Sequence, residues 1–241
     1  MSYFIFNGVN SDDLGIMLTA TPVRPSWKKE STEFTIAGKA KKYIQQSETY
    51  DNQSMTIDAF IDDISQANLQ KIYNLFQGEG ELLLSTNLNE YLNVIAEPPS
   101  IKAIALTSGE CSLKFTVKPF AYSLNPTTAN ISDEGNFVKI NNNSSLISEP
   151  FISFSPQTQL TIINVNGSEF SVTTPDGCSY ESTIFIDSEE HIVYFQRPEG
   201  TIYPCTQYTT GEFPRLHEGE NYIMYTGTTQ NFKINAKERY L

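Results

Sequence analysis

The clearest hydrophobic patterns along the chain are those of half-buried β-strands. Within Met55–Ile61 every odd position is apolar, and the even positions are polar except for Phe60. Residues 112–118 alternate in the same way. Successive side chains on a strand point to opposite faces, so each segment would place one face on a core and the other in solvent. Shorter apolar runs predict further strands in the first half at residues 3–6, 81–86, 91–96 and 101–106.

One segment has a helical period. Between Ser65 and Gln77 the apolar side chains recur three and four residues apart, at Leu69, Ile72, Tyr73 and Phe76. Ser65 can cap the first turn through its hydroxyl, and Gly78 supplies a left-handed end. We therefore expect a single helix whose apolar side lies on a sheet.

Residues 22–42 interrupt these patterns with a long polar stretch. Six basic residues surround the only tryptophan there, namely Arg24, Lys28, Lys29, Lys39, Lys41 and Lys42 around Trp27. The stretch is typical of a long loop or an extended hairpin rather than of a core, and long loops in compact domains are usually functional or mobile. Cations interleaved with an aromatic could attract nucleic acid, but Glu30 and Glu33 and the acidity of the chain favour a contact with protein.

The second half shows no helical period. Residues 125–150 are rich in Asn, Ser and Thr and indicate a domain boundary that contains one short strand at 137–140. Short strands between turns are then predicted at residues 151–154, 160–165, 169–173, 182–186, 191–195, 221–225 and 231–235. Strands at this spacing favour a sandwich or jelly roll. The sequence thus predicts a mainly β protein, with a sheet-plus-helix domain over residues 1–125 and an all-β domain over residues 126–241.

Composition and charge narrow the partners. The net charge is −12, with 16 basic and 28 acidic residues among 241. Specific nucleic-acid binding needs clustered Lys and Arg, so we expect none. The first residues carry no secretory signal and no stretch is apolar for long enough to span a bilayer, so we expect synthesis in a cytoplasm and no membrane insertion. Three scattered cysteines, Cys111, Cys178 and Cys205, fit neither a disulfide framework nor a metal site.

Catalytic arrangements are not evident. The carboxylate pairs at 12–13, 62–63 and 189–190 are adjacent in sequence, so on a strand they would face opposite ways. His191 and His217 are the only histidines, and no metalloprotease, nucleophile-elbow or phosphate-loop motif accompanies them. Residues 164–169 have some oxygen ligands of a calcium loop but fit a tight hairpin turn better. We expect no enzyme activity, no metal and no cofactor.

Several motifs, taken in order, resemble those of the distal tail proteins (Dit family) of siphophages and prophages, which are tail-tip or baseplate hub proteins. The N-terminal motif is Phe6-Asn7-Gly8 followed by Ser11-Asp12-Asp13-Leu14-Gly15-Ile16. The single helix ends in Phe76-Gln77-Gly78, and the first half closes on Val117-Lys118-Pro119-Phe120-Ala121-Tyr122. The second half contains a turn from Phe213 to Asn221 and ends on Lys237-Glu238-Arg239-Tyr240-Leu241.

The resemblance implies a structural role and a set of partners. The first domain would be a tail-tube-like β-sandwich with one flanking helix that forms a hexameric ring around a channel for DNA. The second would be a galectin-like β-sandwich, and the last strand could pack back on the first domain. The ring would link the major tail-tube protein to the tail-associated lysin or fibre hub protein, with a receptor-binding protein as a further candidate partner. The protein would belong to the virion tail tip and be assembled in the host cytoplasm.

Two sets of candidate contact residues follow. For contacts between subunits or with the tube, the candidates are Arg24, Trp27, Lys28, Lys29, Lys39, Lys41 and Lys42, and a deletion of residues 24–42 should yield monomers. The rival function is binding of cell-wall saccharide by the second domain, with exposed aromatics stacking on sugar rings. Its candidates are Tyr180, Tyr194, Tyr203 and Tyr208. Galectin-type sites use a tryptophan, and the only one here lies in the other half.

Overall fold

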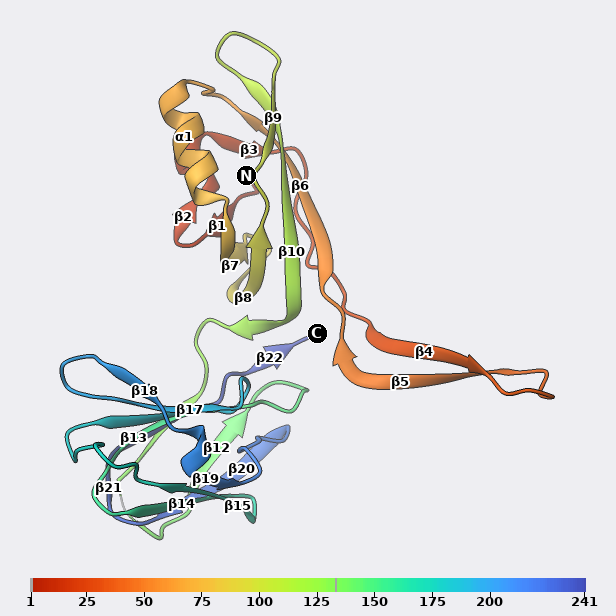
Figure 1. Cartoon of the computed structure of the whole chain (residues 1–241). Coiled ribbons are helices and arrows are strands. Elements are labelled where there is room, and N and C mark those ends of the chain that lie inside the picture. The colour runs from red at the N-terminus through yellow and green to blue at the C-terminus, as the bar shows by residue number, and fades with distance from the viewer. Residues whose placement is uncertain (1, 133) are drawn as a thin grey trace. The chain divides into compact units, whose positions relative to one another are not determined.

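The computed structural model describes residues 2–132 and 134–241, which form two compact units. Unit 1 contains residues 1–124 with Leu241, and unit 2 contains residues 125–240. Each unit is built mainly of antiparallel strands, and the described residues hold a single α-helix, α1 (Gln66–Leu75), in unit 1 (Figure 1). The fold is therefore mainly β, as the alternating patterns predicted.

Unit 1 is built on one continuous antiparallel sheet. Its strands lie in the order β2 (Val9–Asn10), β1 (Phe4–Phe6), β7 (Gly78–Leu84), β8 (Asn87–Ala96), β10 (Gly109–Ser123), β6 (Gln53–Ile61) and β3 (Ile16–Leu18). A further strand, β9 (Ser100–Ala103), pairs with the first part of β10. The alternation predicted for Met55–Ile61 is confirmed, since its odd positions are buried and its even positions exposed.

Helix α1 begins where the sequence predicted. The Ser65 hydroxyl accepts a hydrogen bond from the backbone N–H of Asn68, and Ile72 and Phe76 are fully buried. The Phe76 ring stacks on Phe6 at 5.3 Å and meets Phe4 and Phe115 edge-on at 6.0 and 6.1 Å. Aromatic pairs of this geometry stabilise a core beyond the area that they bury. The helix is thus held to the sheet by an aromatic cluster.

The N-terminal motif has a structural explanation. Asn7 has a positive φ of 49° in the turn between β1 and β2, and its side-chain oxygen accepts the backbone N–H of Glu81 at 2.9 Å. The Ser11 hydroxyl is buried and accepts the N–H of Phe4 at 3.3 Å. Gly15 ends the 3-10 helix η1 (Ser11–Leu14) at φ 67°, and a Cβ there would lie 1.8 Å from the Asp62 carboxylate. Asn7 and Ser11 therefore satisfy backbone N–H groups, and Gly15 occupies a position where a side chain would clash.

A separate hairpin projects from unit 1. Its strands are β4 (Lys29–Thr35) and β5 (Lys42–Tyr50), which pair only with each other (Figure 1). Residues 30–46 are all exposed. We call residues 29–50 the arm. Of the two forms expected for the polar stretch, a loop or a hairpin, the structure has the hairpin, and it extends to Tyr50.

Unit 2 consists of two antiparallel sheets that share one core. The first has the order β11 (Thr128–Ile131), β21 (Thr229–Asn235), β13 (Phe151–Pro156), β16 (Thr183–Asp187), β17 (Ile192–Gln196) and β18 (Ile202–Pro204). The second has the order β12 (Val138–Asn142), β20 (Gly219–Thr226), β14 (Leu160–Val165), β15 (Ser168–Thr173) and β19 (Thr209–Gly211). Buried residues of both sheets form one cluster that includes Phe154, Phe170, Tyr225 and Phe232. The arrangement is a β-sandwich.

The turn motif of residues 213–221 is organised by Asn221. This fully buried amide donates hydrogen bonds to the carbonyls of His217 and Gly219, at 2.8 and 2.9 Å. Its oxygen accepts the N–H of His217 and the side-chain amide of Asn166, so one residue joins the turn to the hairpin between β14 and β15. Every polar group of this buried amide therefore has a partner.

Several short elements were not predicted from the sequence, and one predicted strand was placed too long. β11, β18 and β19 have only three or four residues each, too few for a pattern. β22 (Arg239–Tyr240) and η2 (Thr206–Tyr208) are similarly short. The strand expected over residues 101–106 ends at Ala103, because the N–H groups of Ile104 and Ala105 turn back to the carbonyl of Ser108. Within the described part of the chain, no helix is long and apolar enough to cross a bilayer.

Candidate functional site

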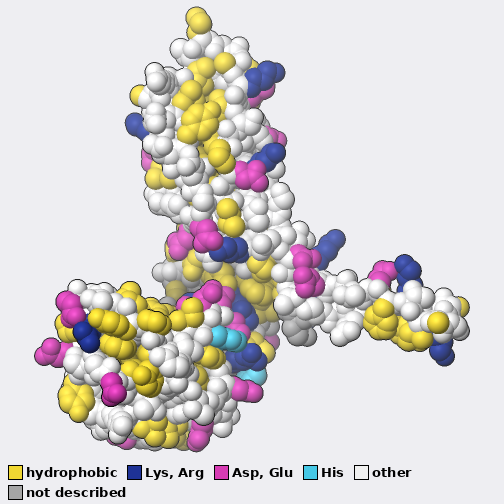
Figure 2. Space-filling view, in the orientation of Figure 1, with side chains coloured by type: hydrophobic (Ala, Val, Ile, Leu, Met, Phe, Trp, Pro, Cys, Tyr) yellow, Lys and Arg dark blue, Asp and Glu magenta, His cyan; other side chains and the backbone are white. Residues whose placement is uncertain are grey.

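The arm is the most exposed element of unit 1. Four of its large apolar side chains lie in solvent, Phe34 at 44%, Ile36 at 44%, Tyr43 at 41% and Ile44 at 63% exposure. Figure 2 shows a hydrophobic patch on the projecting hairpin. An isolated two-stranded hairpin is at best marginally stable in water, and a clustered apolar patch marks a contact surface. These features make the arm a candidate for contact with another protein surface.

The register of the hairpin gives it two different faces. Phe34 lies opposite Tyr43, and their rings stack at 5.8 Å. The neighbouring pair, Glu33 opposite Ile44, points to the other face, where Lys42 binds Glu33 at 2.9 Å. One face is therefore aromatic, and the other combines an aliphatic side chain with an ion pair.

The basic candidates divide between the two ends of the arm. Lys39, Lys41 and Lys42 lie at its exposed tip, where Gly38 has φ 80° and the N–H of Lys39 bonds to the carbonyl of Ile36 at 3.0 Å. Lys28 is exposed at the base, and Lys29 lies 5.8 Å over the ring of Tyr50. The structure places three lysines where a partner could reach them and fastens Lys29 to the hairpin itself.

Arg24 and Trp27 lie below the arm rather than on it. Trp27 is 8% exposed, and the Arg24 guanidinium lies 5.9 Å over its ring. Arg24 also binds Glu90 of β8 at 2.5 Å and the backbone carbonyl of Leu241. Tyr50 packs edge-on against Phe120 of β10 at 5.1 Å. These residues anchor the arm to the sheet, which is a different role from the direct contact expected for Arg24 and Trp27.

The four tyrosines proposed for saccharide binding do not form one site. Tyr180 is 65% exposed in the loop before β16, and Tyr208 is 39% exposed in η2. Tyr203 stacks on Phe195 at 5.1 Å beneath the Arg197 guanidinium at 4.7 Å. Tyr194 precedes the buried Phe195 on β17, so it points to the opposite, outer face of its sheet.

That outer face carries an arrangement that the sequence did not reveal. Phe185 lies between Phe151 and Tyr194, with ring separations of 5.8 and 5.1 Å, and all three are half-buried. Beside this row is an open groove of about 570 Å³, lined by the buried Ile131 and Phe232 and by polar residues, among them Asn130, Ser153, Thr183, Asn231 and Lys233. The residues come from four neighbouring strands, so no sequence spacing could have brought them together.

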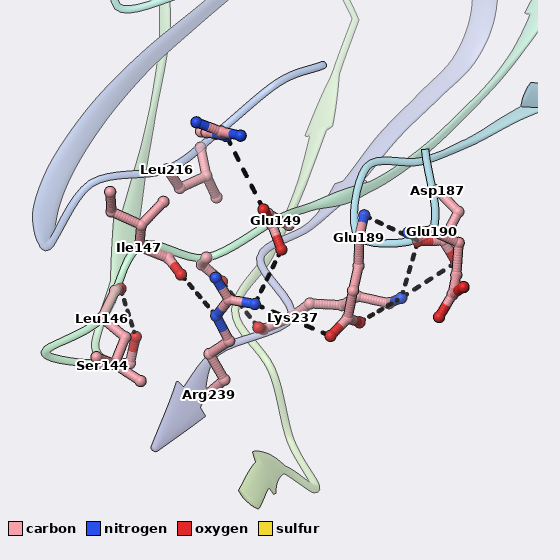
Figure 3. Close-up of polar contacts among 12 residues, drawn as sticks. Ser144, Leu146, Ile147, Glu149, Asp187, Glu189, Glu190, Leu216, Lys237 and Arg239 are labelled. Atoms are coloured by element: carbon pink, nitrogen blue, oxygen red, sulfur yellow. Dashed lines mark hydrogen bonds and ion pairs between the residues drawn. The ribbon is translucent and has the colours of Figure 1, made fainter. Parts of the chain in front are cut away.

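Two basic residues near the C-terminal end of unit 2, Lys237 and Arg239, form an ion-pair network with carboxylates from other parts of the unit (Figure 3). Lys237 binds Asp187 at 3.1 Å and Glu189 at 3.2 Å, and Arg239 binds Glu149 at 2.9 Å. Burial alone would lower the pKa of Lys237, but the two carboxylates outweigh it and the pKa is raised. The Glu189 carboxylate of the 189–190 pair is thus held by cations, as expected of a structural group.

Two of the cysteine thiols, those of Cys111 and Cys205, are buried and have raised pKa values. Burial, with the Asp58 charge, raises the pKa of the Cys111 thiol to about 11, and burial next to Cys178 raises that of Cys205 to about 11. Such thiols stay protonated and are poor nucleophiles and ligands. Across residues 2–132 and 134–241, no group of three or more His, Cys, Asp or Glu side chains could hold a metal ion. His191 stacks on Phe213 at 4.8 Å.

Comparison with known proteins finds a match at the level of structure. No protein-family model and no curated protein matches the sequence. The chain is similar to the crystal structure of SPP1 Dit, described as a paradigm of the hub of the adsorption apparatus in phages that infect Gram-positive bacteria. The TM-score is 0.71 at 14% sequence identity, and the match covers 100% of both chains. The two proteins therefore share their fold over the full length of each.

Proposed function

We propose that this protein is a structural subunit of a phage tail tip. The observation that carries the proposal is the full-length match, since SPP1 Dit belongs to the hub of a phage adsorption apparatus and both units of this chain are covered. The subunits would form a hexameric ring that links the tail tube to the tail-associated lysin or fibre hub. DNA would pass through the channel of the ring, and the protein would carry out no chemical reaction.

The arm supports assembly from identical subunits. A ring needs heterologous contacts, in which one surface of a subunit meets a different surface of the next. The arm offers an exposed aromatic pair and an exposed Ile44 on a hairpin whose strands pair with no other strand among the described residues. Burying these side chains on a neighbour would stabilise both the contact and the hairpin.

The acidic charge supports passage of DNA without retention. A chain with net charge −12 lacks the clustered cations that hold phosphates, and a ring would multiply the repulsion. The lysines at the tip of the arm are few, and Lys42 is paired with Glu33.

Electron microscopy of the purified full chain tests the proposal. Negative-stain images should show rings with a central hole, and light scattering after size exclusion should give six times the chain mass of 27.1 kDa. A monodisperse monomer at all concentrations would contradict the proposal.

Variants of the arm test its role within the ring. Replacing residues 30–48 with Gly-Gly should leave unit 1 folded, because the anchor residues Arg24 and Trp27 remain. The variant should be monomeric, because the exposed contact surface of the arm has been removed. The double variant Phe34→Ser with Ile44→Ser should weaken assembly in the same direction. Thr32→Ser with Gln46→Ser, on the same strands, is the matched control and should assemble normally.

A second function is favoured by the outer face of unit 2. Flat, half-buried rings beside amide and hydroxyl groups suit the apolar face and the hydroxyls of a sugar. We propose the groove beside Phe185 and Tyr194 as the saccharide site, which keeps Tyr194 of the four tyrosine candidates and leaves out Tyr180, Tyr203 and Tyr208. Cell-wall pulldown of the full chain should be weakened by Tyr194→Ala and unchanged by Tyr180→Ala. If both variants bound cell walls equally well, the aromatic side chains beside the groove would have only a packing role.

A further inference from the structure

The loop between β9 and β10 exposes a run of apolar residues. Residues 103–106, Ala-Ile-Ala-Leu, are all exposed, with Ile104 at 51% and Leu106 at 100%. A single exposed leucine needs no explanation, but four consecutive exposed apolar residues are unfavourable unless they have a function. We call residues 103–108 the apolar tip.

The apolar tip is held in a defined turn. The N–H groups of Ile104 and Ala105 both bond to the carbonyl of Ser108 at 3.1 Å, which closes the loop on itself. The N–H of Ile64 bonds to the carbonyl of Thr107 at 3.0 Å and ties the loop to the segment after β6. Leu106 is therefore presented on an ordered turn, and little conformational entropy remains to be lost on binding.

A small apolar pocket lies at the other end of the same sheet. Its floor consists of buried aliphatic side chains, Leu82, Leu84, Leu92 and Ala121. Its rim is polar, with Thr86, Asn87 and the Arg24–Glu90 ion pair. The volume of about 60 Å³ is far below that of a pocket for a small-molecule ligand, roughly 300–1,000 Å³, and suits one aliphatic side chain.

One chain cannot fill its own pocket. The tip immediately precedes Gly109 at the start of β10, whereas Ala121 lies near its end. Between positions 109 and 121, β10 takes 12 residue steps, of which two are absorbed by the bulge after Val117, so it spans roughly 33 Å at about 3.3 Å for each remaining step. An apolar projection at one end of a sheet and an apolar pocket at the other are complementary only between two molecules, and their contact is head-to-tail.

We propose that the apolar tip of one copy inserts Leu106 into the pocket formed by Leu82, Leu84, Leu92 and Ala121 of a second copy. This contact is separate from the arm and deepens the proposed assembly by naming a second pair of matching surfaces. A lipid surface is the less suitable occupant. Lys102 is the one basic residue in the loop and its flanks, Glu110 follows at once, and the chain carries a net charge of −12.

Paired cysteine variants test the contact directly. In a Cys178→Ser background, which removes the partly accessible thiol, Leu106→Cys chains are mixed with Thr86→Cys chains and oxidised. A cross-linked dimer should form only when both variants are present. Thr56→Cys, exposed on the open face of β6, replaces Thr86→Cys in the matched control and should not cross-link. No dimer with Thr86→Cys, or equal dimer with Thr56→Cys, would overturn the proposal.

Charge variants test the energetic role of the tip. Leu106→Asp should weaken self-association of the full chain by about tenfold, whereas Thr107→Asp adds the same charge one residue away and should have little effect. If rings form normally with Leu106→Asp and no cross-link appears, the tip contact is wrong and the proposed function stands. Flotation with phosphatidylcholine vesicles, with or without phosphatidylglycerol, that depends on Leu106 would instead assign the tip to a membrane and overturn the proposal.

Discussion

Trp27 shows how the arm is joined to its sheet. Its ring is buried under the Arg24 guanidinium, and its indole N–H has no hydrogen-bond partner among the described residues. The large apolar surface of the ring, rather than its N–H group, must therefore account for the contribution of Trp27 to the free energy of unfolding.

Truncation of Trp27 should destabilise unit 1. Trp27→Ala leaves a cavity and should lower the free energy of unfolding by about 3 kcal/mol. Trp27→Phe keeps most of the packing and removes an unpaired donor, so its cost should stay below about 1.5 kcal/mol. Urea denaturation of the full chain measures both values. Equal costs for the two variants would mean that the N–H, not the ring, is important.

Lys237 is the residue on which the ion-pair network of unit 2 depends. Its ammonium group lies between Asp187 and Glu189, and all three side chains are at most 26% exposed. Lys237→Met would remove the cation that Asp187 and Glu189 share, with the Arg239 guanidinium still 4.0 Å from Glu189, and should cost about 2 kcal/mol of unfolding free energy at pH 7. Lys139→Met breaks the exposed pair with Glu220 and should leave the denaturation midpoint unchanged.

The effect of Lys237 also has a defined pH dependence. Because the pKa of Lys237 is raised in the folded chain, its stabilisation is complete below pH 10.5, the ordinary lysine value. It is lost as the pH rises through the higher pKa of the folded state. The difference between wild type and Lys237→Met should therefore be constant from pH 7 to 10 and shrink above that range. A difference that shrank between pH 7 and 9 would contradict the assignment.

At the scale of elements, the sequence predicted those that have one buried face. The strand over residues 53–61 and helix α1 each bury one side, so their side chains follow the period of the backbone. β4 and β5 of the arm are exposed on both faces, so nothing imposes alternation on them and the hairpin could not be distinguished from a loop. The pocket of unit 1 and the groove of unit 2 combine residues that are far apart in the sequence, and only the pairing of their strands brings them together.

The exposed arm should be the first segment to be cleaved in dispersed protein. Its strands pair only with each other, residues 30–46 are all exposed, and Lys39, Lys41 and Lys42 cluster at the tip. Local opening of such a hairpin costs little free energy, so trypsin should cut there before it reaches either core. Within an assembled ring the same sites should be protected. Mass spectrometry of a digestion time course, on dispersed and assembled fractions, identifies the first cut, and equal rates in both fractions would exclude the arm from the contact.

At the scale of the whole molecule, two separate cores share one chain. The aromatic cluster around Phe76 belongs to unit 1, and the cluster around Phe232 belongs to unit 2. A chain with two cores need not unfold in one step, because each core contributes its own cooperative transition. The arm, the apolar tip and its pocket all belong to unit 1, and the aromatic groove belongs to unit 2. This division separates assembly surfaces from the saccharide candidate.

Calorimetry of single and double variants tests whether the cores are independent. Trp27→Ala should lower the melting temperature of one transition and Lys237→Met that of the other, because each side chain packs within a single unit. Changes in separate cores with no shared partner add, so the double variant should show both shifts at their single-variant size. A shift of both transitions by either substitution alone would show that the units unfold together. Assembly through surfaces of unit 1 would then also depend on substitutions in the sandwich of unit 2.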